Sequence, residues 1–295
     1  MPIVRLLPAT DSDRPVASRV AIYGPTGKFK TTSIIKTWPR TYKDHEKIAI
    51  LSYPGEKGWG TIPRDDPEIL ASVWEIDDIE KVNPHAVIKE VEKFTADAAA
   101  SNVATFAGDG AHKLYPWYFR RALLDKIANA PKGWDGDEDK LFGPTYGQAH
   151  NDYGLYMTKL LSSTIPYVVV TFWDSLERLD PENTSRSAPK GQYPDLPGVM
   201  GRNVGGEFSA TLYAEATEPD MRGRSRGFWV TRPEGRIRAA CIKVPPGIGE
   251  KIPVRIPQHF DVLQMYMSGN SVGATELAKK LLGSESILAP LASKP

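Results

Sequence analysis

An apolar run breaks into a glycine-containing turn in Val20-Ala21-Ile22-Tyr23-Gly24-Pro25-Thr26-Gly27-Lys28-Phe29-Lys30-Thr31-Thr32. The turn matches the phosphate-binding pattern G-x-x-x-x-G-K-[ST] at Gly24, Lys30 and Thr31, and it departs from the pattern where Phe29 replaces the second glycine. Backbone N–H groups of such a turn, placed at the N-terminus of a helix, satisfy the charges of a polyphosphate. The sequence therefore predicts that residues 24–32 bind the phosphates of a nucleotide.

The context of the turn favours this interpretation over a chance turn that contains Gly, Pro and Lys. A strand-like segment, residues 19–23, precedes it, and residues 31–36 can continue as a helix. We expect Lys30 to add a cation for the outer phosphates and Thr31 to give Mg²⁺ one hard oxygen ligand.

The composition is that of an ordinary soluble globular protein. The chain has 295 residues, 41% of them hydrophobic and 25% charged, which is enough for one large α/β domain or two small ones. Its 37 basic and 36 acidic residues give a net charge of +1, so any nucleic-acid surface has to be local. A single cysteine, Cys241, and the lack of any apolar run long enough for a bilayer predict a cytoplasmic protein with no membrane contact.

Two carboxylates follow strand-like segments. Glu56 lies just beyond the apolar segment 47–53, at the edge where nucleotide sites of open α/β sheets lie. It is therefore a candidate to orient or deprotonate water, and an equally good interpretation is a solvated glutamate in a turn. Asp109 closes the segment 102–109, where a second Mg²⁺-organising carboxylate would stand, although Asp-Gly is also a common turn. Thr171 and Asp174, at the end of segment 165–173, can sense a γ-phosphate or cap a turn.

Periodicity predicts the remaining elements. We expect a strand at 72–76, helices at 84–100, 111–130, 146–163 and 275–282, and antiparallel strands at 207–214, 226–232 and 235–244. Residues 180–206 show no periodicity, which indicates a functional loop or disorder. The one marked concentration of basic residues lies late in the chain, and a solvated sheet face is a nearly equal interpretation of it: Arg222, Arg224, Arg226, Arg232, Arg236, Arg238 and Lys243. We divide the chain into an arm (1–17), a main domain (18–265) and a C-terminal helix and tail (266–295).

The order of these parts resembles the RecA-like P-loop ATPases of bacteriophages, the group that includes nucleotide-binding proteins of the single-strand-annealing recombinase type. The resemblance covers about residues 19–263 and is most specific at 24–32, Glu56, Gly108-Asp109 and Leu196-Pro197-Gly198. It implies a P-loop core with a mostly parallel sheet flanked by helices and antiparallel strands added at the C-terminal edge. Phe29 and Trp173 depart from the family's pattern, and either departure can mean slow hydrolysis or binding without turnover.

The resemblance also implies roles for individual residues. Lys30 and Thr31 would bind phosphate and Mg²⁺, Asp109 would be the second-motif acidic residue, and Glu56 would be the catalytic glutamate. Members of this group work as homo-oligomeric rings or filaments, in which a cation from the next subunit completes the site; Lys243 or Arg238 would be that cation here. Single-stranded DNA would contact four cations of the segment 178–202, namely Arg178, Arg186, Lys190 and Arg202.

Three functions therefore compete. The first is an Mg²⁺-dependent ATPase that acts on single-stranded DNA in phage recombination or replication. The second is a nucleotide-binding structural or assembly protein whose altered phosphate loop turns over little or no ATP. The third is a phosphoryl-transfer enzyme for a small substrate, for which no separate acceptor-binding motif is visible.

Overall fold

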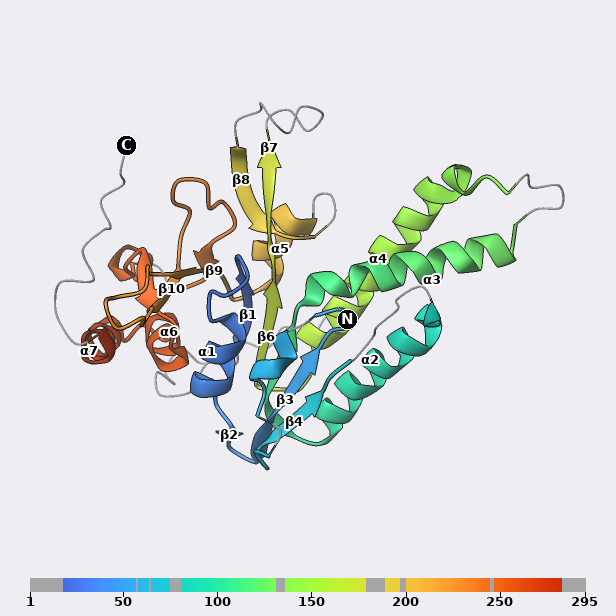
Figure 1. The fold of residues 1–295 in the computed structure, drawn as a ribbon. Coiled ribbons are helices and arrows are strands. Elements are labelled where there is room, and N and C mark those ends of the chain that lie inside the picture. The colour runs from blue at the N-terminus through green and yellow to red at the C-terminus, as the bar shows by residue number, and fades with distance from the viewer. Residues whose placement is uncertain are drawn as a thin grey trace, which may run out of the picture.

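A mostly parallel sheet with helices on both faces forms the body of the protein (Figure 1). The structure is a computed structural model that describes residues 18–56, 58–63, 65–74, 81–130, 136–178, 189–196, 200–244 and 247–282. Within these residues, ten strands belong to the main sheet: β1 (Ser18–Tyr23), β2 (Thr41–Tyr42), β3 (His45–Ser52), β4 (Ile69–Ser72), β5 (Val103–Asp109), β6 (Tyr167–Phe172), β9 (Ala210–Ala216), β10 (Gly227–Val230), β11 (Cys241–Ile242) and β12 (Arg255–Pro257).

The strand order is β12-β10-β9-β1-β6-β5-β3-β2, with β4 paired to β3 and β11 paired to β9. Strands β9, β1, β6, β5, β3 and β4 run parallel to one another, whereas β10, β11 and β12 add antiparallel pairings at the C-terminal edge. A separate two-stranded hairpin, β7 (Asp174–Arg178) and β8 (Pro189–Pro194), follows β6 directly. The predicted fold class, a mostly parallel sheet flanked by helices with antiparallel strands at that edge, is confirmed.

Two helical layers cover the sheet. In Figure 1, α1, α6 and α7 lie on one side of it, and α2, α3 and α4 lie on the other, where α3 and α4 extend beyond the sheet as a pair. The α-helices are α1 (Lys30–Thr37), α2 (Pro84–Ala100), α3 (Tyr115–Ala128), α4 (Phe142–Leu161), α5 (Met200–Glu207), α6 (Phe260–Met267) and α7 (Ser271–Leu282). Short 3₁₀ turns are η1 (Gly58–Thr61), η3 (Ala111–Lys113), η4 (Glu138–Leu141) and η5 (Gly249–Lys251).

Alternation along the central strands creates the two cores. In β1, Ala21 and Tyr23 pack under α2, α3 and α4, whereas Val20 and Ile22 pack under α1, α6 and α7. Since successive side chains of a strand point to opposite faces, a strand that is apolar at every position has to be covered on both sides. This is why the apolar segments read from the sequence became the centre of the sheet.

The structure also corrects several expectations. The strand expected at 72–76 lies earlier, as β4. The antiparallel strand expected at 207–214 is β9, which pairs antiparallel with β10 and β11, as predicted, and also pairs parallel with β1. The third antiparallel segment, 235–244, contributes only the two residues of β11. The segment 180–206, expected to be irregular, contains β8 and all but the last residue of α5 where it is described.

The C-terminal helices belong to the main body. The boundary that the sequence suggested between residues 265 and 266 falls inside α6, and α7 buries Ala274, Ala278 and Leu282 in the same core as α1. The arm (1–17) and residues 283–295 lie outside the described residues. Across the described ranges, no helix combines the length and the apolar character needed to cross a bilayer.

Candidate nucleotide-binding site

The phosphate loop, residues 24–29, leaves the carboxyl end of β1 and leads straight into α1. Gly24 has a φ of 144°, and a Cβ at this position would stand 2.8 Å from the backbone oxygen of Ala214 on β9. Gly27 has a φ of 76°. Glycine adopts such angles without the steric cost that other residues meet, so the loop depends on both glycines, and at Gly24 also on the lack of a side chain.

Phe29 occupies the position where the phosphate-binding pattern has its second glycine. Its φ of 59° and ψ of 18° are left-handed, and its carbonyl accepts the first helical hydrogen bond, from Ser33 N–H at 2.8 Å. A left-handed backbone costs a residue other than glycine about 1–2 kcal/mol. The loop therefore carries some backbone strain at Phe29, and the ring is 37% exposed.

Lys30 turns its side chain back into the loop. Its Nζ donates hydrogen bonds to the carbonyl oxygens of Gly24 at 2.7 Å and Pro25 at 2.8 Å, and only 8% of the residue is exposed. Burial lowers the pKa of the Lys30 ammonium, while the carboxylates of Asp109 and Glu56 act in the opposite direction. A cation held in this way inside a glycine loop is matched to an anion entering the same space.

Asp109, at the end of β5, binds two hydroxyl groups from different elements. Its Oδ2 accepts from Thr31 on α1 at 2.8 Å, and its Oδ1 accepts from Thr171 on β6 at 2.7 Å. Thr171 also accepts from the N–H of Gly110 at 2.8 Å, so one buried hydroxyl fixes both the carboxylate and the backbone after it. A hydroxyl and a carboxylate in contact are the hard oxygen donors that Mg²⁺ prefers, so Thr31 and Asp109 fit the ion that the sequence assigned to them.

Glu56 lies four residues beyond β3 and packs against Gly110. A Cβ built on Gly110 would stand 2.5 Å from Glu56 Oε2 and 2.8 Å from its Cγ, and Gly110 has a φ of 79°. The glutamate therefore occupies the space that a side chain at Gly110 would take. Asp109 and Glu56 reach the same region from neighbouring parallel strands, because β3 and β5 end side by side.

These groups line one cavity of about 360 Å³ at the carboxyl edge of the sheet. The lining includes the loop from Thr26 to Thr32 together with Glu56, Asp109 and Thr171. Ligand pockets in proteins commonly have volumes of about 300–1,000 Å³. Asp174, the other residue suggested as a γ-phosphate sensor, is not among the described lining residues; its carboxylate accepts from Gln192 Nε2 at 3.1 Å.

Trp173 closes one side of the cavity and belongs to an aromatic cluster. Its ring contacts that of His112 in a tilted arrangement, with centroids 4.8 Å apart and an interplanar angle of 35°, and Lys113 Nζ lies 3.9 Å from the Trp173 ring centroid. The backbone N–H of Trp173 donates to His112 Nδ1 at 3.3 Å. Burial, followed by the nearby ammonium groups of Lys113 and Lys30, lowers the pKa of His112 to about 3, so this imidazole is neutral at pH 7.

Sequence reasoning missed Gln258, which holds the phosphate loop from outside. Its Nε2 donates to the carbonyl oxygens of Lys28 at 3.0 Å, Phe228 at 3.0 Å and Glu215 at 3.3 Å, and so ties the loop to β9 and β10. No short-range signal marks a residue 230 positions after its partner in the chain. Thr61, which also lines the cavity, was missed for the same reason.

Within one chain, Lys243 lies outside this cavity. It follows β11, which pairs with the beginning of β9, and its Nζ donates to the carbonyl oxygen of Gly206 at 2.6 Å. The phosphate loop begins after Tyr23, which pairs with Tyr213 further along β9, and its Gly24 lies against Ala214. A role for Lys243 in the site would therefore need a second subunit. Arg238 is exposed and is not among the described lining residues of the cavity, and both assignments stay predictions.

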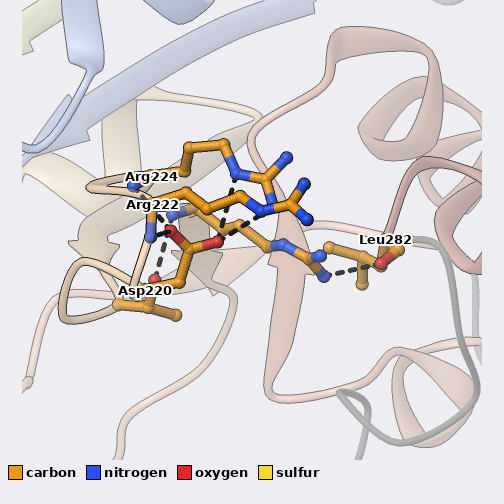
Figure 2. Close-up of polar contacts among 6 residues, drawn as sticks. Asp220, Arg222, Arg224 and Leu282 are labelled. Carbon is orange, nitrogen blue, oxygen red and sulfur yellow. Dashed lines mark hydrogen bonds and ion pairs between the residues drawn. The ribbon is translucent and has the colours of Figure 1, made fainter.

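The late basic residues do not form one continuous row. Asp220 organises the loop between β9 and β10: its Oδ1 accepts from the backbone N–H groups of Arg222 at 2.8 Å and Arg224 at 2.9 Å, and its Oδ2 pairs with the Arg224 guanidinium at 3.1 Å (Figure 2). Arg226 instead donates to the carbonyl oxygen of Leu282, at the end of α7, at 2.6 Å.

The four residues predicted to bind DNA cannot be assigned contacts. Arg186 lies outside the described residues. Arg178, Lys190 and Arg202 belong to β7, β8 and α5, and for these three residues only the backbone is described. Their role in DNA binding stays a prediction.

Comparisons with known proteins give distant likenesses. The chain is similar to a prototypical ATPase from the type III secretion system of pathogenic bacteria (TM-score 0.38, 10% identity, 68% of this chain and 51% of the other), so the match spans about half of that ATPase. It is also similar to a KaiC-like protein from Pyrococcus horikoshii OT3, with a TM-score of 0.36 and 12% identity over 78% of this chain and 88% of the other. A third likeness is to the flagellar accessory protein FlaH from Methanocaldococcus jannaschii, with a TM-score of 0.30 and 10% identity over 73% of this chain and 77% of the other. No family model and no curated protein matches the sequence. Because their TM-scores are below 0.5, we infer no function from these likenesses, and the proposed function is based on the geometry of the site.

Proposed function

We propose that this protein binds ATP together with Mg²⁺ and hydrolyses it. One observation carries the proposal: a buried ammonium group, a hydroxyl–carboxylate pair and a glutamate, from three separate segments, line the same cavity beside a glycine loop at a helix N-terminus. Lys30, Thr31, Asp109 and Glu56 are therefore the residues on which the activity should depend. Open α/β sheets bind their ligands at this edge of the sheet.

The chemistry assigns each residue a different task. The backbone N–H groups of the loop and the Lys30 ammonium hold the phosphates. Thr31 and Asp109 would hold Mg²⁺, which when bound offsets the negative charge on the phosphate oxygens. Glu56 accepts a proton from water while the water oxygen forms a bond to the terminal phosphorus and the bond from that phosphorus to the bridging oxygen breaks.

Turnover measurements on matched variants test this function. Lys30→Ala should lose nucleotide affinity, and Glu56→Gln should keep the affinity but lose at least about 100-fold in turnover, the lower bound for a general base. Lys159→Ala, an exposed lysine on α4, is the control and should behave as the wild type. Unchanged nucleotide affinity in Lys30→Ala would refute the phosphate site.

The finer part of the proposal is that the ATPase works as a cytoplasmic homo-oligomer on single-stranded DNA, in phage recombination or replication. It is supported by the sequence's resemblance to RecA-like phage ATPases and by exposed cations such as Arg222, Arg232 and Arg236. Turnover with and without single-stranded DNA, recorded together with the assembly state, tests it. DNA affinity should fall steeply with salt, because contacts to phosphates release counterions.

A nucleotide-binding assembly protein is the second candidate, and the strained Phe29 in the phosphate loop is the observation that favours it. This candidate predicts that wild-type protein binds ATP and oligomerises with it, but shows no turnover above that of Glu56→Gln. Turnover that rises with single-stranded DNA would exclude it in favour of the ATPase.

A further inference from the structure

A second cavity, of about 410 Å³, adjoins the phosphate cavity. The two share Phe29 and Thr32 as lining residues. Beyond them, the second cavity runs along α1 past Lys36, and Arg226 and His259 lie in its wall. A ligand anchored by its phosphates at Lys30 therefore lies next to this space, with Phe29 and Thr32 at the boundary between the two cavities.

The shared wall contains the strained residue. Phe29 keeps a left-handed backbone although its side chain makes that conformation costly, and the ring stays more than a third exposed instead of joining either core. Strained residues persist where the surrounding structure fixes them, and they cluster at ligand sites. An exposed aromatic ring between two cavities is a surface on which a planar base can stack.

The rest of the second cavity suits the polar half of a nucleoside. Its described lining includes cationic and neutral hydrogen-bonding groups, those of Lys36, Arg226, His259 and Gln258, and it includes no carboxylate. Its walls are also held in place. Gln258 donates a hydrogen bond to the carbonyl oxygen of Lys28 in the phosphate loop. Arg226 donates a hydrogen bond to the carbonyl oxygen of Leu282, the last residue of α7, which is labelled in Figure 2.

We propose that the second cavity holds the nucleoside of the bound nucleotide, with its base stacked on the ring of Phe29. The inference rests on the proposed function, because it assumes that the phosphates lie in the loop. It assigns a purpose to the residue that departs from the phosphate-binding pattern: the ring replaces a glycine because it recognises the base. The site then selects nucleoside triphosphates over inorganic polyphosphate.

The test compares two ligands that share their phosphates. The affinities for ATP and for inorganic tripolyphosphate are measured by calorimetry in Mg²⁺ for the wild type, Phe29→Gly and Phe29→Tyr. Phe142→Ala, which removes an exposed ring at the start of α4, is the matched control. Glycine tolerates the left-handed backbone, so Phe29→Gly should unfold at the same or a higher denaturant concentration than the wild type.

We expect the wild type to bind ATP at least 10-fold more tightly than tripolyphosphate. Phe29→Gly should bind tripolyphosphate as the wild type does but lose about 10-fold in ATP affinity, in the range found when a stacking ring is removed. Phe29→Tyr should keep the preference, and Phe142→Ala should change neither affinity.

Three results would overturn the inference in distinguishable ways. An equal loss of affinity for ATP and for tripolyphosphate in Phe29→Gly would mean that the ring only shapes the loop. Equal affinity of the wild type for both ligands would leave the phosphate site in place without a nucleoside pocket. A wild type that binds neither ligand would remove the inference together with the proposed function.

Discussion

Replacing Thr171 by valine should destabilise the protein more than this small change in side-chain structure suggests. Valine keeps the branched shape that suits β6 but lacks the hydroxyl, which is 1% exposed and makes two hydrogen bonds. One is donated to the Asp109 carboxylate at 2.7 Å and the other is accepted from Gly110 N–H at 2.8 Å.

The size of the effect follows from these two contacts. A hydrogen bond to a charged group contributes about 1.5–3 kcal/mol, and a buried donor left without a partner costs about 1–3 kcal/mol. Since Asp109 keeps its contact with Thr31, we take values near the lower end of each range. The free energy of unfolding should therefore fall by about 3 kcal/mol.

Urea unfolding at pH 7, followed by circular dichroism, measures this difference against two controls. Thr171→Ser keeps the hydroxyl and should lose about 1 kcal/mol, the contribution of one buried methyl group. Thr105→Val, at a buried threonine that donates to the carbonyl oxygen of Pro39 at 2.6 Å, loses one neutral hydrogen bond and should cost about 1 kcal/mol. A Thr171→Val loss no greater than that of Thr105→Val would refute the bridging role of the hydroxyl.

Three further predictions concern the surroundings of the site. Gly110→Ala places a methyl group against Glu56 and a side chain on a positive φ, so turnover should fall and stability should drop by about 1 kcal/mol or more, measured by ATP hydrolysis and urea unfolding. Gln258→Leu removes the donor to Lys28 and should weaken ATP binding in calorimetry without a mutation in the loop itself, whereas unchanged affinity would show that the loop holds its shape alone. The third prediction concerns pH. The folded protein keeps His112 neutral down to about pH 3 and the unfolded chain protonates it near 6.5, so the unfolded state binds more protons below pH 6.5. Stability should therefore fall as the pH drops, by up to about 1.4 kcal/mol per pH unit, and His112→Gln should reduce this slope in urea titrations at pH 7 and pH 5.

The sequence predicted the elements whose signals are local. The helix α2 begins at Pro84, as expected, because Asn83 caps it by accepting from the N–H of His85 at 2.9 Å. The apolar, β-branched segment that became β6 lies in the centre of the sheet, between β1 and β5. The residues predicted to bind phosphate and Mg²⁺ also gather in one cavity, since strand ends of a parallel sheet meet at one edge.

The features that the sequence did not predict depend on contacts between segments far apart in the chain. Alternation predicted β9 and its antiparallel pairing, which β10 and β11 confirm, but not its parallel pairing with β1, because period-2 patterning is the same for both kinds of pairing. The strand β8 carries proline and glycine and no alternation; it exists through its pairing with β7. Gln258 and Thr171 acquire their contacts only when segments far apart in the chain are brought together.

The position of β1 in the sheet has a consequence for how the protein matures on the ribosome. Ser18 lies opposite Tyr167, and Val20 lies opposite Ala210, so the strand that carries the phosphate loop emerges long before either neighbour. At translation rates of about 5–20 residues per second, the first neighbour follows after roughly 7–30 s. During that interval the nascent strand has no partner on either side, and the loop lacks Gln258, which is translated later still. A phosphate ligand can thus stabilise only the completed fold, in which β1 has both neighbours and the loop has Gln258.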